Sequence, residues 1–129
     1  MQRFFFEQLV DSQVRDIHST LTKKQKEYSR DEDVLINFRS AAVMQNATMR
    51  EALGGMMAKH TVSIFQLINS WECAPMETWS EKITDHINYL ILLKAIVAEE
   101  LQAKTAAQPL PFEEGETPLY KSGIDTTPA

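Results

Sequence analysis

The chain of 129 residues is long enough for one compact domain. Its formal net charge of -5 argues against an extended electrostatic contact with nucleic acid or an anionic membrane, because such binding needs clustered lysine and arginine. The single cysteine, Cys73, excludes an intrachain disulfide, and we expect it to be inert and partly buried. The first ten residues lack the apolar core of a signal peptide, and the most apolar run, residues 87–98, is too short to span a bilayer. We therefore expect a cytoplasmic protein.

The spacing of apolar residues predicts a first helix over residues 6–28. Its apolar face comprises Val10, Val14, Ile17 and Leu21. We expect the phenylalanines at positions 4–6 to lie against another helix or a partner chain. A second helix is expected between Ser29, which has the spacing of a capping box with Glu32, and about Gln45. Its apolar face comprises Val34 or Leu35, Phe38 and Ala42.

A third helix is predicted to start at Thr48, which has the capping-box spacing with Glu51. Its apolar face comprises Met49, Leu53, Met56, His60, Ile64, Leu67 and Trp71. The pair Gly54 and Gly55 costs roughly 1 kcal/mol per glycine relative to alanine inside a helix. The pair therefore suggests either a close approach by another helix or a ligand, or a bend.

A fourth helix is predicted from about Thr78, which has the capping-box spacing with Glu81, to about Ala103. Apolar residues cover most of its sides from Ile83 to Leu101, so we expect it to be buried on several sides, at the centre of a bundle or in a dimer interface. The sequence thus predicts an all-α bundle of about four helices over residues 1–104. A proline-rich tail, flexible or lying on the surface, is expected over residues 105–129.

A polar stripe interrupts the apolar surface of this last helix. Glu81, Asp85 and Asn88 are spaced four and three residues apart and share one face. Carboxylates partly inside a bundle are costly unless a cation or a polar group satisfies them, and Mg²⁺ prefers carboxylate and amide oxygens. The simpler interpretation is that Glu81 completes the capping box of Thr78 and that Asp85 is a solvated acid near the helix start.

A second polar cluster lies within one turn of the third helix and contains Lys59, His60 and Ser63. Lys59 is suited to contact a phosphate, or else it is a solvated residue at the edge of the helix. His60 falls in the apolar stripe, where a hydrogen-bonded core histidine is the simpler interpretation and a ligand or base is the alternative.

A third cluster surrounds the first break in the helical pattern and consists of Glu27, Asp31, Glu32, Asp33 and Asn37. It is either a solvated acidic turn or the second half of a metal site. Its spacing does not match a calcium-binding EF-hand loop. The sequence also lacks a phosphate-binding glycine-rich loop, a zinc-ligand spacing and a nucleophile elbow.

The order of these clusters resembles the small MazG-like proteins of phages and prophages, within the all-α NTP pyrophosphohydrolases. The resemblance covers roughly residues 22–101. It rests on Lys26-Glu27-Tyr28, Asp33-Val34-Leu35-Ile36-Asn37-Phe38, Lys59-His60 and the run from Glu81 to Tyr89. The Glu-x-x-x-Asp spacing is one residue longer than the family's Glu-x-x-Asp, and the family's Glu-Glu-x-x-Glu motif has no literal match.

The resemblance implies a helical bundle that forms a dimer or tetramer and cleaves a nucleoside triphosphate, ribo or deoxy, to the monophosphate and pyrophosphate. It implies Mg²⁺, with Mn²⁺ as a substitute, and the host cytoplasm as the location if the protein is phage-encoded. The implied metal ligands are Glu81 and Asp85. Glu27 or Asp33 is implied to complete the metal site or orient water, and Lys59 and Asn37 are implied to contact the substrate. His60 is implied to support the pocket, and Asn88 to be a metal ligand or a contact to the sugar or phosphate. Two alternatives are a bundle that binds a nucleotide without cleaving it and a protein that docks on a host protein.

Overall fold

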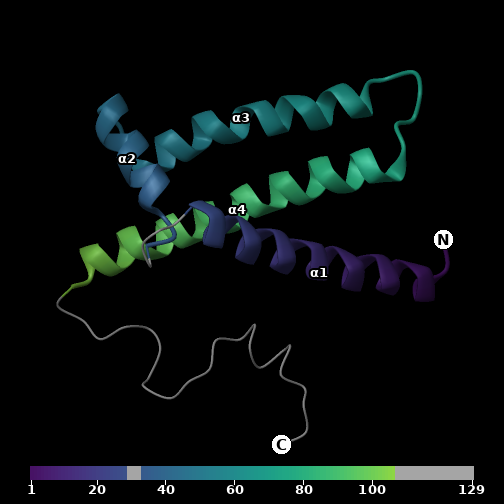
Figure 1. The fold of residues 1–129 in the computed structure, drawn as a ribbon, viewed down its shortest axis with the longest axis horizontal. Coiled ribbons are helices and arrows are strands. Elements are labelled where there is room, and N and C mark those ends of the chain that lie inside the picture. Colours follow the sequence, from purple (N-terminus) through teal and green to yellow (C-terminus); the bar gives the residue numbers. More distant parts are fainter. Residues whose placement is uncertain (29–32, 107–129) are drawn as a thin grey trace, which may run out of the picture. The chain divides into compact units, whose positions relative to one another are not determined.

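The computed structural model describes residues 1–28 and 33–106, apart from the side chains of residues 24–28. It contains α1 (Arg3–Tyr28), α2 (Ile36–Gln45), α3 (Met49–Ile68) and α4 (Met76–Lys104), shown in Figure 1. All regular secondary structure in the described residues is α-helical, which confirms the predicted all-α class. The chain divides into two compact units, residues 1–97 and 98–129, and the packing described below belongs to the first. The predicted tail lies almost entirely outside the described residues.

The start of α3 confirms the predicted capping box. The backbone N–H of Glu51 donates to the Thr48 hydroxyl, and the backbone N–H of Thr48 donates to the Glu51 carboxylate, both at 3.1 Å. Just before it, Asn46 ends α2 with a φ of 49°, in the left-handed region that asparagine tolerates better than most residues. The short break between α2 and α3 is therefore fixed at both ends by local chemistry. The capping box predicted for Ser29 lies outside the described residues.

The start of α4 differs from the prediction. The helix begins at Met76, directly after Pro75, and the backbone N–H of Thr78 donates to the Pro75 carbonyl at 3.0 Å. Thr78 therefore lies inside the helix, so its predicted capping box with Glu81 is wrong. Proline is well suited to a helix start, because it lacks the N–H that would have no partner there. The correction also removes helix capping as an explanation for Glu81.

A small hydrophobic core joins α2, α3 and α4. Its buried members are Leu35, Phe38, Leu53 and Ile96. Partly buried residues pack around them: Met49, Met56, Met57, Tyr89, Leu92, Leu93 and Ala95. Of the two candidates left open by the sequence, Leu35 is buried and Val34 is exposed. Leu53 and Ile96 are fully buried, and full burial of a leucine or isoleucine contributes about 1.5–3 kcal/mol to stability.

Many large apolar side chains are exposed in the single chain. On α1 these are Phe4, Phe5, Phe6, Leu9, Val10 and Val14, and on α3 they are Val62, Phe65 and Ile68. On α4 they include Ile83, Leu90, Ile91 and Val97. One chain alone therefore leaves part of the apolar surface of α4 exposed, and its burial in a dimer interface stays a prediction. The phenylalanines belong to α1, which starts three residues earlier than predicted, and they are not covered by another helix of the chain.

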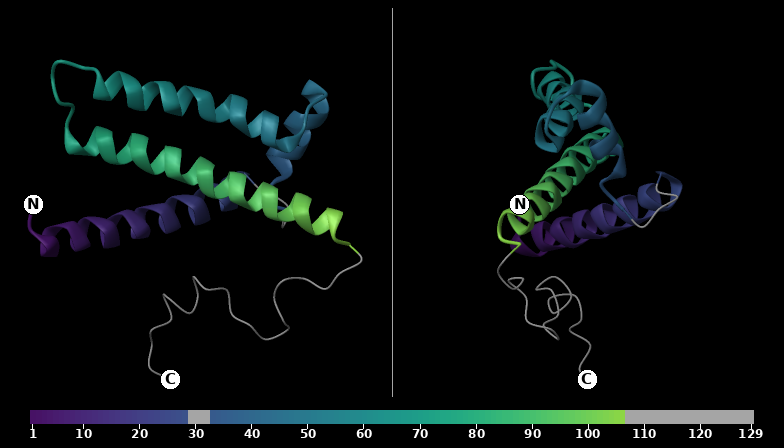
Figure 2. Two further views of the ribbon diagram at one scale, coloured as in Figure 1. Left: turned by 180° about the vertical axis from the view of Figure 1, so that it is seen from behind. Right: turned by 90° about the vertical axis from the view of Figure 1, so that its left-hand side faces the viewer.

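Two further expectations are wrong beyond the end of α3, and a third is narrowed in the middle of the helix. α3 ends at Ile68, so Trp71 lies beyond the helix and is fully exposed in the loop that leads to α4, which Figure 2 shows from two sides. Cys73, in the same loop, is exposed rather than partly buried. A Cβ atom built at Gly54 or Gly55 meets nothing within 4 Å, so neither glycine makes room for a neighbouring helix of the chain.

None of the described helices has the length and apolar character needed to cross a membrane.

Candidate functional site

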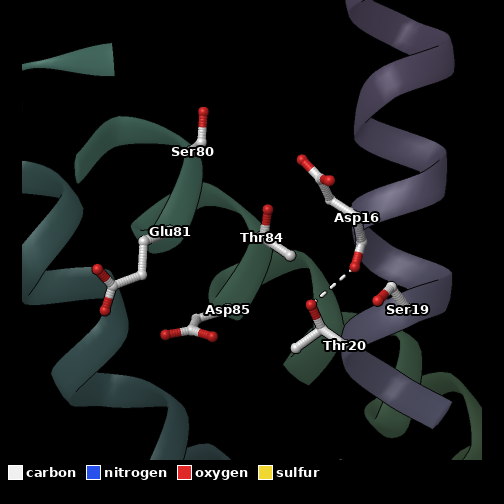
Figure 3. A pocket seen from close by; sticks show the side chains of 7 residues that line it. All are labelled: Asp16, Ser19, Thr20, Ser80, Glu81, Thr84 and Asp85. Atoms are coloured by element: carbon white, nitrogen blue, oxygen red, sulfur yellow. Dashed lines mark hydrogen bonds between the residues drawn. The ribbon is translucent and has the colours of Figure 1, made fainter. Parts of the chain in front are cut away.

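Side chains of α1 and α4 line an open cleft of about 430 Å³ (Figure 3). They are Asp16, Ser19 and Thr20 of α1, and Ser80, Glu81, Thr84 and Asp85 of α4. Every one of the seven ends in a carboxylate or a hydroxyl group. The volume falls within the range of small-molecule sites, roughly 300–1,000 Å³. The chemistry of the lining favours a cation, or a polar ligand that carries one.

The two walls of the cleft are joined by a hydrogen bond. The Nε2 of Gln13 on α1 donates to the Thr84 hydroxyl on α4 at 2.8 Å, and Thr84 is buried. On the α1 side, the Thr20 hydroxyl donates to the Asp16 carbonyl at 2.7 Å, as Figure 3 shows. Such a bond to the preceding turn restricts the rotation of the hydroxyl group. Gln13 thus links α1 to α4, whereas the Thr20 bond lies within α1.

The predicted metal ligands Glu81 and Asp85 both belong to this cleft. Figure 3 shows their carboxylates on one side of α4, turned away from Asp16. Their four-residue spacing brings them onto the same face of the helix. The Glu81 side chain is mostly exposed and lies 3.9 Å from the Lys82 ammonium, a distance at which a surface ion pair contributes little. The Glu81 carboxylate is thus accessible at the edge of the cleft, and Asp85 lies half-buried one helical turn away.

The described residues contain no group of three or more His, Cys, Asp or Glu side chains placed to hold a metal ion together. Glu81 and Asp85 are two carboxylates, and Asp16 faces the other side of α4 in Figure 3. Magnesium normally keeps several water ligands and is held by one or two carboxylates together with substrate phosphates. The donor set of the cleft fits that mode of binding.

Asn88 continues the polar stripe of α4 into the interior. It is 5% exposed, and neither its Oδ1 nor its Nδ2 has a hydrogen-bond partner among the described residues. A buried polar group without a partner costs about 1–3 kcal/mol, and such groups are uncommon in folded proteins. The sequence singled out Asn88 as a candidate substrate-binding residue, and its buried amide has no partner among the described residues.

The candidate residues of α3 do not line the cleft. His60 is half-buried, and its ring lies 4.7 Å from the ring of Tyr89 on α4. Lys59 is exposed. A second contact between the helices joins His86 Nε2 to the Thr61 hydroxyl at 3.1 Å. The aromatic contact of His60 and the His86 bond hold α3 against α4.

The candidate residues around the break between α1 and α2 are Glu27, Asp33 and Asn37, and neither Asp33 nor Asn37 belongs to the lining of the cleft. The Asp33 carboxylate accepts hydrogen bonds from the Leu35 backbone N–H at 3.0 Å and from Arg39 Nε at 2.8 Å. The Arg39 guanidinium, together with that N–H, holds the pKa of Asp33 below its ordinary value of 3.8. Asp33 thus has a local role at the start of α2, while Asn37 is exposed. The Glu27 side chain lies outside the described residues.

Sequence reasoning missed the contribution of α1 to the cleft. Asp16 and Thr20 are four residues apart, so a polar face of α1 was visible beside its apolar one. The uncharged Thr84 was also passed over, although it lies three residues after Glu81 on the same helix. What the sequence did not reveal is that this polar face of α1 meets α4. A comparison of the chain with protein-family models, curated proteins and solved structures found no match.

Proposed function

We propose that the protein is a magnesium-dependent pyrophosphohydrolase that cleaves a nucleoside triphosphate, ribo or deoxy, to the monophosphate and pyrophosphate. The observation that supports this most is the carboxylate pair Glu81 and Asp85 at the edge of a cleft otherwise lined by hydroxyl groups and Asp16. Carboxylates repel a triphosphate, so an acidic cleft accepts one only with a divalent cation between them. The MazG-like order of residue clusters points to the same reaction.

In this proposal Glu81 and Asp85 bind the cation, with Mn²⁺ as a substitute for Mg²⁺. A cation bound there would neutralise phosphate charge and lower the pKa of a water that it binds. The hydroxyl groups of Ser80 and Thr84 can donate hydrogen bonds to phosphate oxygens, and Ser19 can do the same from α1. The roles given to Glu27, Asp33, Lys59, His60 and Asn37 by the resemblance stay predictions.

We further propose that the chain forms a dimer or tetramer in the cytoplasm. The support is the number of large apolar side chains exposed on α1, α3 and α4. Large exposed apolar patches are uncommon on monomeric soluble proteins and usually mark an interface. An isologous dimer is the simplest assembly that covers the same face on two copies.

The exposed aromatic residues favour a second candidate function. Phe4, Phe5 and Phe65 are more than half exposed, and Trp71 is fully exposed. Aromatic side chains are enriched at protein interfaces. A protein that docks on another protein through these residues, without nucleotide chemistry, is the alternative.

Pyrophosphate release from a panel of ribo- and deoxynucleoside triphosphates tests the proposal. The reactions contain Mg²⁺ or Mn²⁺, with EDTA in the control. Metal-dependent release is expected, and one base should be preferred. If no triphosphate is cleaved, a thermal-shift screen with the same nucleotides separates a nucleotide binder, which they stabilise, from a docking protein, which they leave unchanged.

A further inference from the structure

The buried amide of Asn88 lies where the polar and apolar parts of α4 meet. Thr84, Asn88, Leu92 and Ile96 follow one another at four-residue intervals and therefore lie along one side of the helix. Thr84 lines the cleft, whereas Leu92 and Ile96 belong to the hydrophobic core. Asn88 is thus one helical turn further along α4 than Thr84, toward the hydrophobic core. It is the last polar residue of the series before the core.

The chemistry of the amide restricts what can satisfy it. Its Oδ1 accepts hydrogen bonds and its Nδ2 donates them, and both atoms are buried without a partner among the described residues. A metal ion would satisfy only Oδ1, and a phosphate, which offers acceptors, would satisfy only Nδ2. A planar group with a donor and an acceptor side by side satisfies both atoms at once. The edge of a nucleobase has this arrangement, and asparagine is a frequent bidentate partner of adenine.

The position of Asn88 relative to the acid pair fits a nucleotide. Glu81 and Asn88 are seven residues apart on α4, which corresponds to about 10 Å along the helix axis. A base bound at Asn88 would therefore lie away from phosphates held through a cation at Glu81 and Asp85. The uncharged Thr84 lies between the two ends of this line.

We propose that Asn88 binds the edge of the nucleobase and is the base-recognising residue of this protein. The proposal rests on the proposed function for the identity of the ligand, since it takes that ligand to be a nucleotide. It replaces the role that the resemblance implies for Asn88, which is a metal ligand or a contact to the sugar or phosphate. Both amide atoms are buried in the free chain, so the side chains around Asn88 must move before a base can complete their hydrogen bonds.

Three proteins test this proposal by calorimetry: the wild type, Asn88→Leu, and Gln102→Leu as a matched control. Gln102 is an exposed amide on the same helix. Each is titrated in Mg²⁺ with the nucleoside triphosphate that binds most tightly and with inorganic tripolyphosphate, which has no base. Asn88→Leu is expected to weaken nucleotide binding about tenfold to a hundredfold, as the loss of a bidentate base contact does, and to leave tripolyphosphate binding within twofold. Gln102→Leu should change neither.

The melting temperature without ligand gives a second readout. Leucine replaces an unpartnered buried amide with an apolar group of similar size, so Asn88→Leu should melt at a higher temperature than the wild type. If the leucine variant does not fold, Asn88→Ala takes its place, because alanine removes the amide and adds no new group. It should show the same difference between nucleotide and tripolyphosphate binding.

Several results would overturn the proposal. Equal losses for nucleotide and tripolyphosphate would place Asn88 at the phosphates. Unchanged nucleotide binding, accompanied by a lower melting temperature, would make Asn88 a structural residue. Because these experiments measure binding, they separate base recognition from hydrolysis. A wild type that binds a nucleotide through Asn88 but releases no pyrophosphate would refute the proposed hydrolysis and still support base recognition.

Discussion

Gln13 on α1 and Thr84 on α4 are 71 residues apart in sequence, and their side chains are joined by a hydrogen bond of 2.8 Å. This bond lies beside the cleft whose α4 wall holds Glu81 and Asp85. The buried members of the hydrophobic core come from the segment before α2, from α2 itself, and from α3 and α4. A polar contact therefore contributes to the position of α1, and with it to the shape of the cleft.

Replacing Gln13 with alanine should destabilise the protein. Thr84 is buried, and without the Gln13 amide its hydroxyl loses the donor that it has in the structure. We expect a loss of about 1–3 kcal/mol in the free energy of unfolding, measured by urea denaturation. Gln8→Ala, at an exposed position of α1, is the control and should change stability little. Equal urea midpoints for the two variants would show that the bond does not hold α1.

Replacing Gly54 or Gly55 with alanine should stabilise α3. Both glycines lie inside the helix, and an added Cβ meets nothing within 4 Å. Alanine is favoured over glycine in a helix interior by about 0.8–1 kcal/mol, largely because glycine leaves the unfolded chain more freedom. Each variant should therefore melt a few degrees higher than the wild type. A lower melting temperature would indicate that another chain or a ligand approaches the glycines closely.

The contribution of Asp33 to stability should depend on pH. Hydrogen bonds from Arg39 and from the Leu35 N–H keep the pKa of Asp33 below 3.8 in the folded chain. A lowered pKa in the folded state means that this contribution is present above about pH 3.8 and is lost as the pH falls through the folded value. The difference in urea midpoint between wild type and Asp33→Asn should shrink below that pH. A constant difference between pH 6 and pH 2 would contradict this assignment.

A charge on the exposed apolar face of α1 should weaken self-association. Val10 and Val14 are nearly half exposed in the single chain, and we propose that a second copy covers this face. Val10→Glu would place a carboxylate in that interface and should shift the sedimentation velocity toward that of a monomer. Arg15→Glu, at another exposed position of α1, is the control. A wild type that sediments as a monomer would rule out the dimer or tetramer.

The fold class followed from helical periodicity, but the burial of each face did not. The apolar spacing correctly predicted the four helices found in the described residues. It also predicted the inward face of α2, where Phe38 and Ala42 are buried, together with Leu35 just before the helix. The spacing of Val10 and Val14 is equally regular, yet both are exposed in the single chain. Periodicity identifies an apolar face and cannot say whether the same chain covers it.

The candidate site, too, could be predicted from the sequence only in part. Glu81 and Asp85 were identified from a four-residue spacing on one helix, and they line one cleft. Asp16, on a different helix, could not be assigned to that cleft without tertiary structure. The capping box of Thr78 failed because Pro75 provides an earlier helix start, whereas Thr48 has no such competitor. Contacts within a helix can be predicted from spacing, while contacts between helices depend on packing.

Magnesium-dependent pyrophosphate release by Asp85→Asn, compared with Glu77→Gln, tests the central claim most directly. Both substitutions remove one carboxylate from α4, but Asp85 lines the cleft and Glu77, in the first turn, does not. If Glu81 and Asp85 together hold the cation, Asp85→Asn should lower the rate by orders of magnitude and Glu77→Gln should retain it. Normal turnover by Asp85→Asn would contradict the assignment of the metal site and the mechanism built on it.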